Sequence, residues 1–336
     1  MADPATILVT GGAGYIGSHV CRELSLRGYR PVVFDNLENG HRWAVRWGPL
    51  EVGDLQDSAA LDAVLARWKP SCVVHMAALV NVGDSMAHPE RYYRNNVAGS
   101  LCLIDAMRRA GVPGLVFSST CATYGEPRTI PIREDAPQFP VSVYGRTKLM
   151  VEQMLGDFDA AYGLRSVCLR YFNAAGACPD GMIGELHQPE THVLPLMLQA
   201  LQKRERPFGV FGTDYKTPDG TCIRDYIHVC DLAAAHVLAV ERLIKGGASC
   251  AVNLGTGKGV SVRELIGMVE RVAGASLSIV EADRRPGDPP VLVADAALAR
   301  RELGWQPVVS AIEEIVVSAH AWQKRLLTEG PPAAIL

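Results

Sequence analysis

The 336-residue sequence lacks the features that mark several classes of protein. No apolar run reaches about 18 residues, the length that a helix needs to cross a bilayer. Lysine and arginine number 33 against 36 aspartates and glutamates, and no block of like charge stands out. The sequence therefore indicates neither a nucleic-acid-binding nor a membrane-binding surface. It has no internal repeat and no low-complexity stretch, and it is long enough to bury a large core and form two domains.

The nine cysteines include no C-x-x-C pair, and their number is odd. Several lie in apolar runs, where a free cysteine behaves as a small buried hydrophobe. We therefore expect no disulfide framework, no metal site and a location in the reducing cytoplasm. Because the first apolar strand begins by about Thr6, we also expect no signal peptide.

The most informative stretch is residues 5–20, A-T-I-L-V-T-G-G-A-G-Y-I-G-S-H-V. Residues 7–10 predict a buried parallel strand, and Tyr15–Leu26 has the apolar spacing of a helix. Four glycines lie between and within them, at positions 11, 12, 14 and 17. Strand, glycine turn and helix in this order suit a dinucleotide, because the backbone can approach the pyrophosphate and the helix N-terminus offers free N–H groups. A tight turn without a ligand is the alternative, which the flanking strand and helix disfavour.

Strand-like and helix-like segments alternate through the first half, which is typical of a parallel sheet covered by helices on both faces. Further strands are predicted at 31–34, 50–53, 72–76, 115–118, 166–171 and 251–254, and further helices from Asp57 to 68 and at 89–110, 142–162 and 229–245. From about Asn173 the alternation stops, and Phe208–Thr221 predicts a glycine-rich, hairpin-like loop.

These segments predict an α/β fold with a Rossmann-type doubly wound parallel sheet and a smaller, discontinuous α/β substrate domain. We assign residues 1–172 and 226–254 to the NAD-binding part, and residues 173–225 and 255–336 to the substrate-binding part. Ligands of open α/β sheets sit beyond the carboxyl ends of the strands. The cleft is therefore expected between the two parts.

Asp35 ends the second predicted strand, 18 residues beyond Gly17. A carboxylate at about this distance accepts hydrogen bonds from the adenosine ribose and repels a 2′-phosphate, so NAD is favoured over NADP. A solvated strand-end acid is the alternative interpretation. The small pair Ala77 and Ala78 follows the fourth strand, where a flat cofactor could pass.

Tyr144 and Lys148 form Y-x-x-x-K near the start of a predicted helix, a spacing that puts both on one face. A tyrosine with an ordinary pKa of about 10 is a poor base at neutral pH. A neighbouring ammonium and a positive nicotinamide would lower that pKa. The motif also occurs by chance on surface helices, but here it follows a dinucleotide turn and five strands. Thr120, at the end of the fifth strand, could bridge the tyrosine and a substrate, or only satisfy nearby backbone.

Eight segments together resemble the extended short-chain dehydrogenase/reductases, and within them the UDP-glucose 4-epimerases. They are TGGAGYIGSH (10–19), DNL with NGHR (35–42), SST-xx-xYGEP (118–127), YGRTK (144–148), LRYFNAAGA (169–177), DGTCIRDYIHVCDLA (219–233), NLGTG (253–257) and RRPGDPP (284–290). The resemblance runs through nearly the whole length. The DGT-x-x-RDYIHV segment is specific to sugar-nucleotide epimerases.

This resemblance implies that Tyr144 is the base, that Lys148 positions it and the cofactor, and that Thr120 is the hydrogen-bonding hydroxyl. The implied NAD-binding residues are Gly11, Gly14, Tyr15, Ile16, Gly17, Asp35, Asn36, Asp54, Leu55, Ala77, Ala78, Asn95, Ser118, Tyr144, Lys148 and Tyr171. The implied UDP-sugar-binding residues are Thr120, Tyr144, Asn173, His192, Val193, Arg224, Arg285 and Asp288. The chemistry of arginine supports the assignment of Arg224 and Arg285, since a diphosphate favours planar, always charged groups.

The implied reaction interconverts UDP-glucose and UDP-galactose with tightly bound NAD. Tyr144 takes the proton of the 4-hydroxyl while C4 gives hydride to NAD; the 4-keto sugar then turns over and takes the hydride back. Nucleotide-sugar 4,6-dehydratases share the first step but carry Asp-Glu after the hydroxyl residue, where this sequence has Cys121 and Ala122. A non-catalytic NAD-binding protein is the third alternative, against which the complete set of Thr120, Tyr144 and Lys148 argues.

The sugar, the pathway and the assembly stay open. Leu292 stands where strict glucose/galactose enzymes carry tyrosine, so an N-acetyl group could be admitted. The STCATYGEP segment also resembles UDP-xylose/UDP-arabinose 4-epimerases, and an apolar pocket rejects a missing group only weakly. Galactose metabolism and polysaccharide precursor supply use the same reaction. The helices at 89–110 and 142–162 resemble those at the interface of homodimers in this family, although their apolar faces would also pack in a monomer.

Overall fold

The computed structural model of the chain describes residues 4–202, 207–285 and 287–334. Its centre is a seven-stranded sheet with the order β10-β6-β5-β4-β1-β2-β3, and every neighbouring pair is parallel. The strands are β1 (Thr6–Thr10), β2 (Arg30–Asp35), β3 (Leu50–Val52), β4 (Cys72–His75), β5 (Gly114–Thr120), β6 (Arg165–Tyr171) and β10 (Cys250–Leu254). The direction of winding reverses between β1 and β4, the point at which such sheets bind dinucleotides. The predicted Rossmann-type sheet is confirmed.

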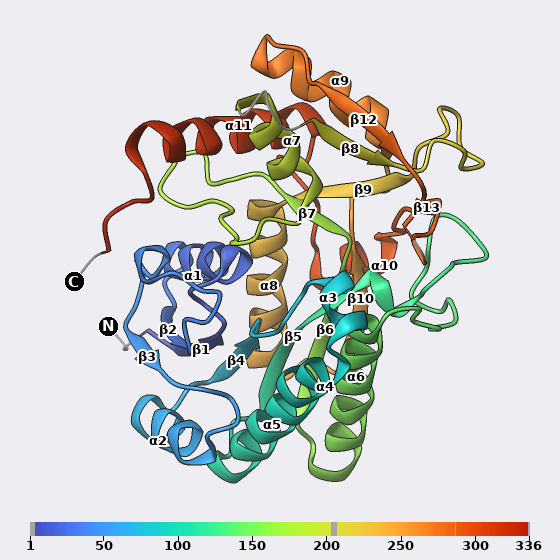
Figure 1. Ribbon diagram of the computed structural model, residues 1–336. Coiled ribbons are helices and arrows are strands. Elements are labelled where there is room, and N and C mark those ends of the chain that lie inside the picture. The colour runs from blue at the N-terminus through green and yellow to red at the C-terminus, as the bar shows by residue number, and fades with distance from the viewer. Residues whose placement is uncertain (1–3, 203–206, 286, 335–336) are drawn as a thin grey trace.

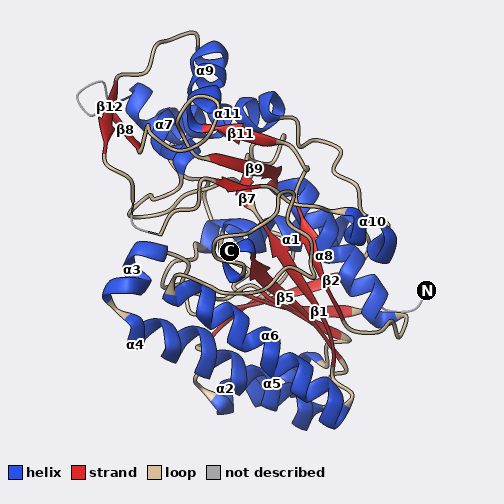
Figure 2. Cartoon of the chain, turned by 90° about the vertical axis from the view of Figure 1, so that its right-hand side faces the viewer, coloured by secondary structure: helices blue, strands red, loops and turns tan. Residues whose placement is uncertain are grey.

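Helices cover both faces of this sheet (Figure 2). One face carries α2 (Ser58–Trp68), α4 (Pro89–Tyr92), α5 (Gly99–Ala110) and α6 (Val143–Tyr162), and the other carries α1 (Tyr15–Leu26), α8 (Val229–Ile244) and α10 (Ala297–Leu303). Along β1, Ile7 and Val9 join the core under α1 and α8, whereas Leu8 joins the core under α2 and α5. A strand buried on both faces is apolar throughout, which is why residues 7–9 form an unbroken apolar run.

Side chains at the helix starts explain two predicted boundaries. Asp57 accepts a hydrogen bond from the Ala60 N–H at 3.0 Å, and α2 begins directly after it. Ser142 accepts one from the Gly145 N–H at 3.1 Å, and α6 begins directly after it. A capping side chain satisfies an N–H that the helix itself leaves free. The predictions of a helix start at Asp57 and at Ser142 are therefore confirmed.

The second part of the molecule lies at the top of Figure 1. β9 (Ile223–His228) pairs with β7 (Asn173–Ala175) and β13 (Val291–Leu292) in parallel and with β11 (Gly259–Ser261) in antiparallel fashion. A separate parallel pair consists of β8 (Phe208–Phe211) and β12 (Ile279–Ala282). The helices α7 (Val193–Gln202), α9 (Val262–Ala273) and α11 (Ile312–Glu329) bury their apolar faces in one shared core.

The helix predicted at 89–110 is confirmed as a continuous helix, but a π-helical turn at Tyr93–Ala98 lies between its α-helical parts α4 and α5. Another predicted element was wrong. Phe208–Thr221 is not a hairpin, because β8 pairs with the distant β12. An apolar pattern reports which residues are buried, and it does not show a local widening of the helix or the partner of a strand.

The boundaries of the two parts also need a correction, although the division itself stays a prediction. The expected boundary between residues 225 and 226 falls inside β9, which belongs to the smaller sheet as a whole. In addition, Ala299 and Trp305 are buried in the core under α1 and α8, and α10 contacts α8 and β10. Part of the chain beyond 255 therefore packs on the large sheet.

In the described part of the chain, no helix is both long and apolar enough to cross a membrane. All nine cysteines lie within the described ranges, and each is a free thiol.

Candidate active site

A cleft of about 800 Å³ opens beyond the carboxyl ends of the large sheet and takes its walls from both parts of the molecule. The predicted site residues that line it are Gly11, Gly14, Tyr15, Ile16, Gly17, Asp35, Asn36, Asp54, Leu55, Ala77, Ala78, Asn95, Thr120, Tyr144, Tyr171, Asn173, His192, Val193 and Arg224. The other four predicted residues, Ser118, Lys148, Arg285 and Asp288, are not among the lining residues.

The glycine turn between β1 and α1 forms one end of the cleft. Gly11 has φ +72°, and a Cβ there would stand 2.5 Å from the Ala77 backbone nitrogen. A Cβ on Gly17 would stand 2.2 Å from the Gly11 carbonyl oxygen, so only glycine lets α1 pack this closely. Gly14 is the N-cap of α1 and provides no side chain to bond the first N–H groups. Those groups are therefore available to an anion, as a dinucleotide pyrophosphate requires.

Asp35 lies beside this turn at the end of β2. Its carboxylate accepts hydrogen bonds from the N–H groups of Ala13 (3.0 Å) and Leu37 (2.9 Å). Burial raises the pKa of Asp35, and these two hydrogen bonds oppose the rise. Asn36 donates to Asp54 at 2.9 Å, so the two also meet at this edge of the sheet. Fixed carboxylates beside a glycine turn fit the ribose hydroxyls of NAD.

The π-helical turn positions the loop that follows β4. Asn96 is buried; its side-chain oxygen accepts from the Leu79 N–H at 2.9 Å, and its amide donates to the Leu79 carbonyl at 3.0 Å. Asn95 donates to Asn96 at 2.8 Å and lines the cleft. Single π turns within helices are frequent at functional sites. This one holds the chain next to Ala77 and Ala78, where the predicted cofactor path runs.

The candidate catalytic side chains meet where β5 ends and α6 begins. Tyr144 lies on the first turn of α6, and the Lys148 nitrogen is 6.0 Å from the centre of its ring. Lys148 donates a hydrogen bond to the Ser118 carbonyl at 2.7 Å. The Ser118 hydroxyl in turn bonds the Tyr171 hydroxyl. Ser118 and Lys148 therefore lie directly behind the wall of the cleft rather than on it.

The protein's own side chains do not give Tyr144 the lowered pKa that the sequence predicts. Burial raises the pKa of Tyr144, and a hydrogen bond with Thr120 only partly opposes the rise. Burial lowers the pKa of Lys148 to about 7, with Glu152 acting in the opposite sense. The low dielectric of this site disfavours both charged forms. Because burial also destabilises the Lys148 ammonium, this group does little to stabilise a Tyr144 phenolate.

The positions after Thr120 carry no acid–base group for neutral pH. Cys121 and Ala122 both line the cleft, and the Ala122 N–H donates to the Thr120 hydroxyl at 3.2 Å. Burial raises the pKa of the Cys121 thiol to about 12. A group with such a pKa does not exchange protons efficiently at neutral pH.

The predicted substrate residues divide into two groups. Asn173, His192, Val193 and Arg224 line the cleft, and Arg224 pairs with Asp288, which places Asp288 one contact behind the wall. Arg285, in contrast, is exposed, and its guanidinium lies 4.0 Å from the ring centre of Phe211. The structure therefore does not bring Arg285 to the cleft. Pro286, in the same family segment, lies outside the described residues.

Several lining residues were not predicted. Leu292 of β13 was predicted only to affect specificity and does line the cleft, as do Tyr226 and Phe172. Glu185 and His187 line it as well, and they cluster with Glu190 and His192. The pattern E-x-H-x-x-E-x-H at 185–192 is the signal by which this cluster could have been found.

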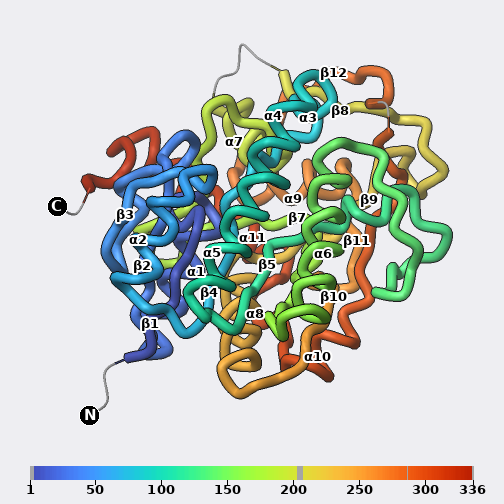
Figure 3. The backbone as a smooth tube through the Cα atoms, turned by 90° about the horizontal axis from the view of Figure 1, so that it is seen from below, coloured from blue at the N-terminus to red at the C-terminus, as the bar shows by residue number. Residues whose placement is uncertain are grey.

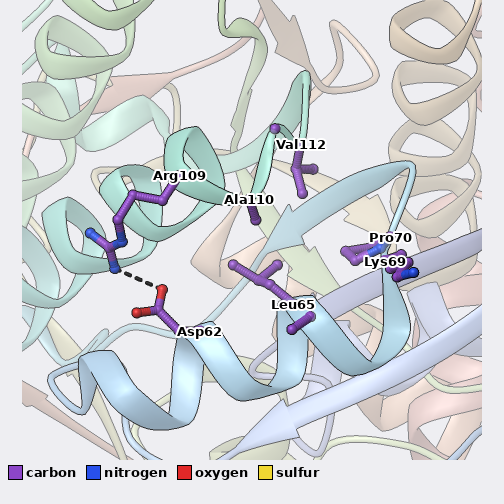
Figure 4. A pocket seen from close by; sticks show the side chains of 9 residues that line it. Asp62, Leu65, Lys69, Pro70, Arg109, Ala110 and Val112 are labelled. Carbon is purple, nitrogen blue, oxygen red and sulfur yellow. Dashed lines mark hydrogen bonds and ion pairs between the residues drawn. The ribbon is translucent and has the colours of Figure 1, made fainter.

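A second hollow, of about 620 Å³, lies between the ends of α2 and α5 (Figure 4). It is at the amino ends of β4 and β5, the edge of the sheet opposite the cleft. Arg109 and Asp62 form an ion pair of 2.8 Å at its side, and Leu65 and Val112 form part of its wall. It contains none of the predicted site residues.

Comparison with known proteins agrees with the motif resemblance. The NAD dependent epimerase/dehydratase family matches residues 7–255. A UDP-glucose 4-epimerase from Rhizobium leguminosarum bv. trifolii is 55% identical over 320 residues, 95% of this chain and 98% of that protein. The crystal structure of UDP-glucose 4-epimerase from Brucella ovis in complex with NAD has a TM-score of 0.92 and 51% identity, and the match covers 94% of this chain and 98% of that one. UDP-glucose-4-epimerase from Stenotrophomonas maltophila, with bound NAD and formylated UDP-arabinopyranose, has a TM-score of 0.92 and 40% identity over 96% of this chain and 99% of that one. The chain belongs to the NAD dependent epimerase/dehydratase family.

Proposed function

We propose that this protein is an NAD-dependent 4-epimerase that interconverts UDP-glucose and UDP-galactose. The observation that carries the proposal is the grouping of Tyr144, Thr120 and Lys148 at the cleft that contains the glycine turn, in a chain 55% identical to a UDP-glucose 4-epimerase. No acid–base group follows Thr120, which favours epimerisation over elimination of water.

The glycine turn and Asp35 would hold NAD. The free N–H groups at the start of α1 suit the pyrophosphate, and the Asp35 carboxylate suits the adenosine ribose. Asn36, Asp54, Leu55 and Asn95 complete the predicted cofactor wall. When bound, NAD supplies a ring that oxidises C4 of the sugar and later reduces it again.

Tyr144 is proposed to move the proton of the sugar 4-hydroxyl, with the Thr120 hydroxyl sharing the hydrogen bond. Lys148 is held on the Ser118 carbonyl and fixes the orientation of this end of α6. Arg224, buried and always charged, is the group best placed to hold the diphosphate. Inversion at C4 needs a firmly held diphosphate and a sugar that can turn over, since the two faces of C4 must be presented in succession.

The decisive experiment incubates the purified protein, with NAD supplied, with UDP-galactose and identifies the product by chromatography. Formation of UDP-glucose supports the proposal. A 4-keto-6-deoxy product would identify a dehydratase instead, and unchanged UDP-galactose would contradict the proposed interconversion.

Leu292 favours a wider substrate range as a second proposal. It lines the cleft where strict glucose/galactose enzymes of the resembling family carry tyrosine, and a solved relative binds formylated UDP-arabinopyranose. UDP-xylose and UDP-N-acetylglucosamine, tested in parallel with UDP-glucose, would show whether pentoses or N-acetylhexosamines are accepted. Turnover of UDP-glucose alone would contradict the wider range.

We also propose a homodimer in the cytoplasm. Leu101 of α5 and Met150 of α6 are 43% and 41% exposed, on two helices that lie side by side (Figure 3). A second copy of the chain would cover these apolar side chains. Nine free thiols support a reducing compartment. Light scattering of the purified protein and cell fractionation test the two statements separately.

A further inference from the structure

Four side chains of metal-binding type lie together at one wall of the cleft; three of them line it, Glu190 lies beside these three, and only His192 is among the predicted substrate-binding residues. The four are Glu185, His187, Glu190 and His192. All come from the segment between β7 and α7, and one nitrogen or oxygen atom of each lies within 4.8 Å of those of the other three. Imidazole and carboxylate together suit borderline divalent ions such as Zn²⁺.

Two distances in the cluster, both from His187, match those around a common centre, whereas the His192 imidazole and the Glu185 carboxylate are in direct hydrogen-bond contact. His187 Nδ1 lies 3.3 Å from Glu185 Oε1 and 3.6 Å from Glu190 Oε1. Ligand atoms in tetrahedral zinc sites, about 2.0–2.1 Å from the ion, are roughly 3.3–3.5 Å from each other. His187 Nδ1 is buried and makes no hydrogen bond to any described residue. His187 Nδ1 therefore lies at ion-pair distance from two carboxylates without a hydrogen bond of good geometry to either of them.

Glu190 gives a second, independent observation. Its side chain is only 4% exposed, and one oxygen accepts hydrogen bonds from the N–H groups of Thr191 and His192 at 2.8 and 2.9 Å. The other oxygen, Oε2, is buried and has no hydrogen-bond partner among the described residues. An unpartnered buried carboxylate oxygen is costly, and a cation would satisfy it.

The segment that contains the cluster is fixed at both sides. The Glu185 carbonyl accepts from the Trp322 ring nitrogen at 2.8 Å, and His41 contacts the Leu186 carbonyl at 3.0 Å. His192 directly precedes α7. The side chains of His187 and His192 are 25% and 45% exposed, so an ion could enter from the cleft.

We infer that Glu185, His187, Glu190 and His192 together bind one divalent cation of the zinc class. With four protein ligands the site is closed and structural. Two carboxylates balance the charge of the ion, and the bound ion ties the wall of the cleft to the start of α7. The inference departs from the expectation of no metal site, which rested on the cysteines alone, and it does not depend on the proposed function.

The test measures metal binding directly. Untagged protein is stripped with a chelator and dialysed against Zn²⁺, and its metal content is measured by mass spectrometry. One equivalent is expected. His187→Gln and Glu190→Gln should each weaken binding at least about tenfold, because even loss of an outer-shell partner has an effect of this size. His320→Gln, which removes an imidazole from α11, should leave binding unchanged.

A second measurement needs no variant. Hydrogen exchange of residues 185–192 in the unaltered protein should slow when Zn²⁺ is added. Binding of Co²⁺ should give a spectrum without the strong near-ultraviolet band of thiolate ligation. Any one of four results would overturn the inference. They are the absence of a stoichiometric ion, binding by His187→Gln as tight as that of the unaltered protein, a thiolate band with Co²⁺, and hydrogen exchange at residues 185–192 that does not change when Zn²⁺ is added.

Discussion

At the scale of single residues, the candidate active site places a phenol and an ammonium where water does not stabilise their charged forms. Tyr144 and Lys148 are 9% and 3% exposed. Burial raises the pKa of the tyrosine and lowers that of the lysine to about 7. Near neutral pH Tyr144 is therefore neutral and Lys148 is in the middle of its titration, and any shift toward the phenolate has to come from what binds in the cleft.

Replacement of Tyr144 by Phe removes the phenol oxygen and keeps the ring. A positioned acid–base group contributes about 10²–10⁴-fold to the rate, and we expect kcat to fall by this factor. Binding of UDP-sugar, measured by calorimetry, should change little. Near-normal turnover of Tyr144→Phe would contradict the role of Tyr144 as the base.

The lowered pKa of Lys148 predicts that the free energy of unfolding depends on pH. Its pKa is about 10.5 in the unfolded chain and about 7 in the folded protein. Between these values the unfolded chain binds the extra proton, so stability rises with pH across this window, by at most about 1.4 kcal/mol per pH unit. Lys148→Met lacks this contribution.

Urea unfolding of both proteins near neutral pH and about two units higher, with equal NAD content, measures the effect. The free energy of unfolding of Lys148→Met, relative to that of wild type, should fall by up to about 2 kcal/mol as the pH rises. A constant difference would show that Lys148 keeps an ordinary pKa. The titration of other groups affects wild type and Lys148→Met equally, so it cancels in the difference between the two proteins.

At the scale of elements, the strand–turn–helix unit around Gly17 requires glycine for packing. A Cβ on Gly17 would meet the Gly11 carbonyl at 2.2 Å, whereas one on Gly267, within α9, would meet nothing within 4 Å. We expect Gly17→Ala to lose bound NAD and to unfold at a lower temperature. Gly267→Ala should keep NAD and be slightly more stable, by about 0.5–1 kcal/mol, because alanine favours a helix.

NAD content by absorbance and melting temperature by calorimetry compare the two variants. Full NAD occupancy in Gly17→Ala would show that the turn can relax without losing its ligand.

Elements with strong local signals could be predicted from the sequence. The helix predicted at Tyr15–Leu26 has the observed bounds, since its apolar spacing and the preceding glycines both act locally. The π-helical turn at Tyr93–Ala98 could not be predicted, because it depends on hydrogen bonds from Asn96 to a loop that follows another strand. The pairing of β8 with β12 likewise depends on residues far apart in the sequence.

The candidate site shows the same division. Residues at the ends of strands, such as Asp35 and Thr120, were predicted to belong to the site because the fold class places strand ends at the cleft, and they do line it. Arg285 lies in a loop, where an aromatic contact with Phe211 decides its direction. Nothing in a linear pattern reports such a contact. The E-x-H-x-x-E-x-H pattern indicates that Glu185, His187 and His192 are near one another in the sequence, but only the structure shows that their side chains meet.

At the scale of the whole molecule, the exposed apolar side chains of α5 and α6 predict the assembly. Leu101→Glu would place a charge in the proposed interface and should convert the dimer to a monomer, measured by light scattering at several concentrations. Leu26→Glu, at the end of α1 and 65% exposed, is the matched control and should leave the mass unchanged. A mass that is the same for wild type and Leu101→Glu would exclude this surface.

The path of the chain has a consequence for the order in which the protein can fold during synthesis. The edge strand β10 ends at Leu254, after the chain has already contributed β7, β8 and β9 to the other part. Until then β6 has no partner on one side, and the helix α10 that covers β10 is synthesised later still. The large sheet and the helices that cover it therefore cannot be completed on the ribosome before much of the smaller part has emerged. A transcript truncated after β6 would encode neither part intact.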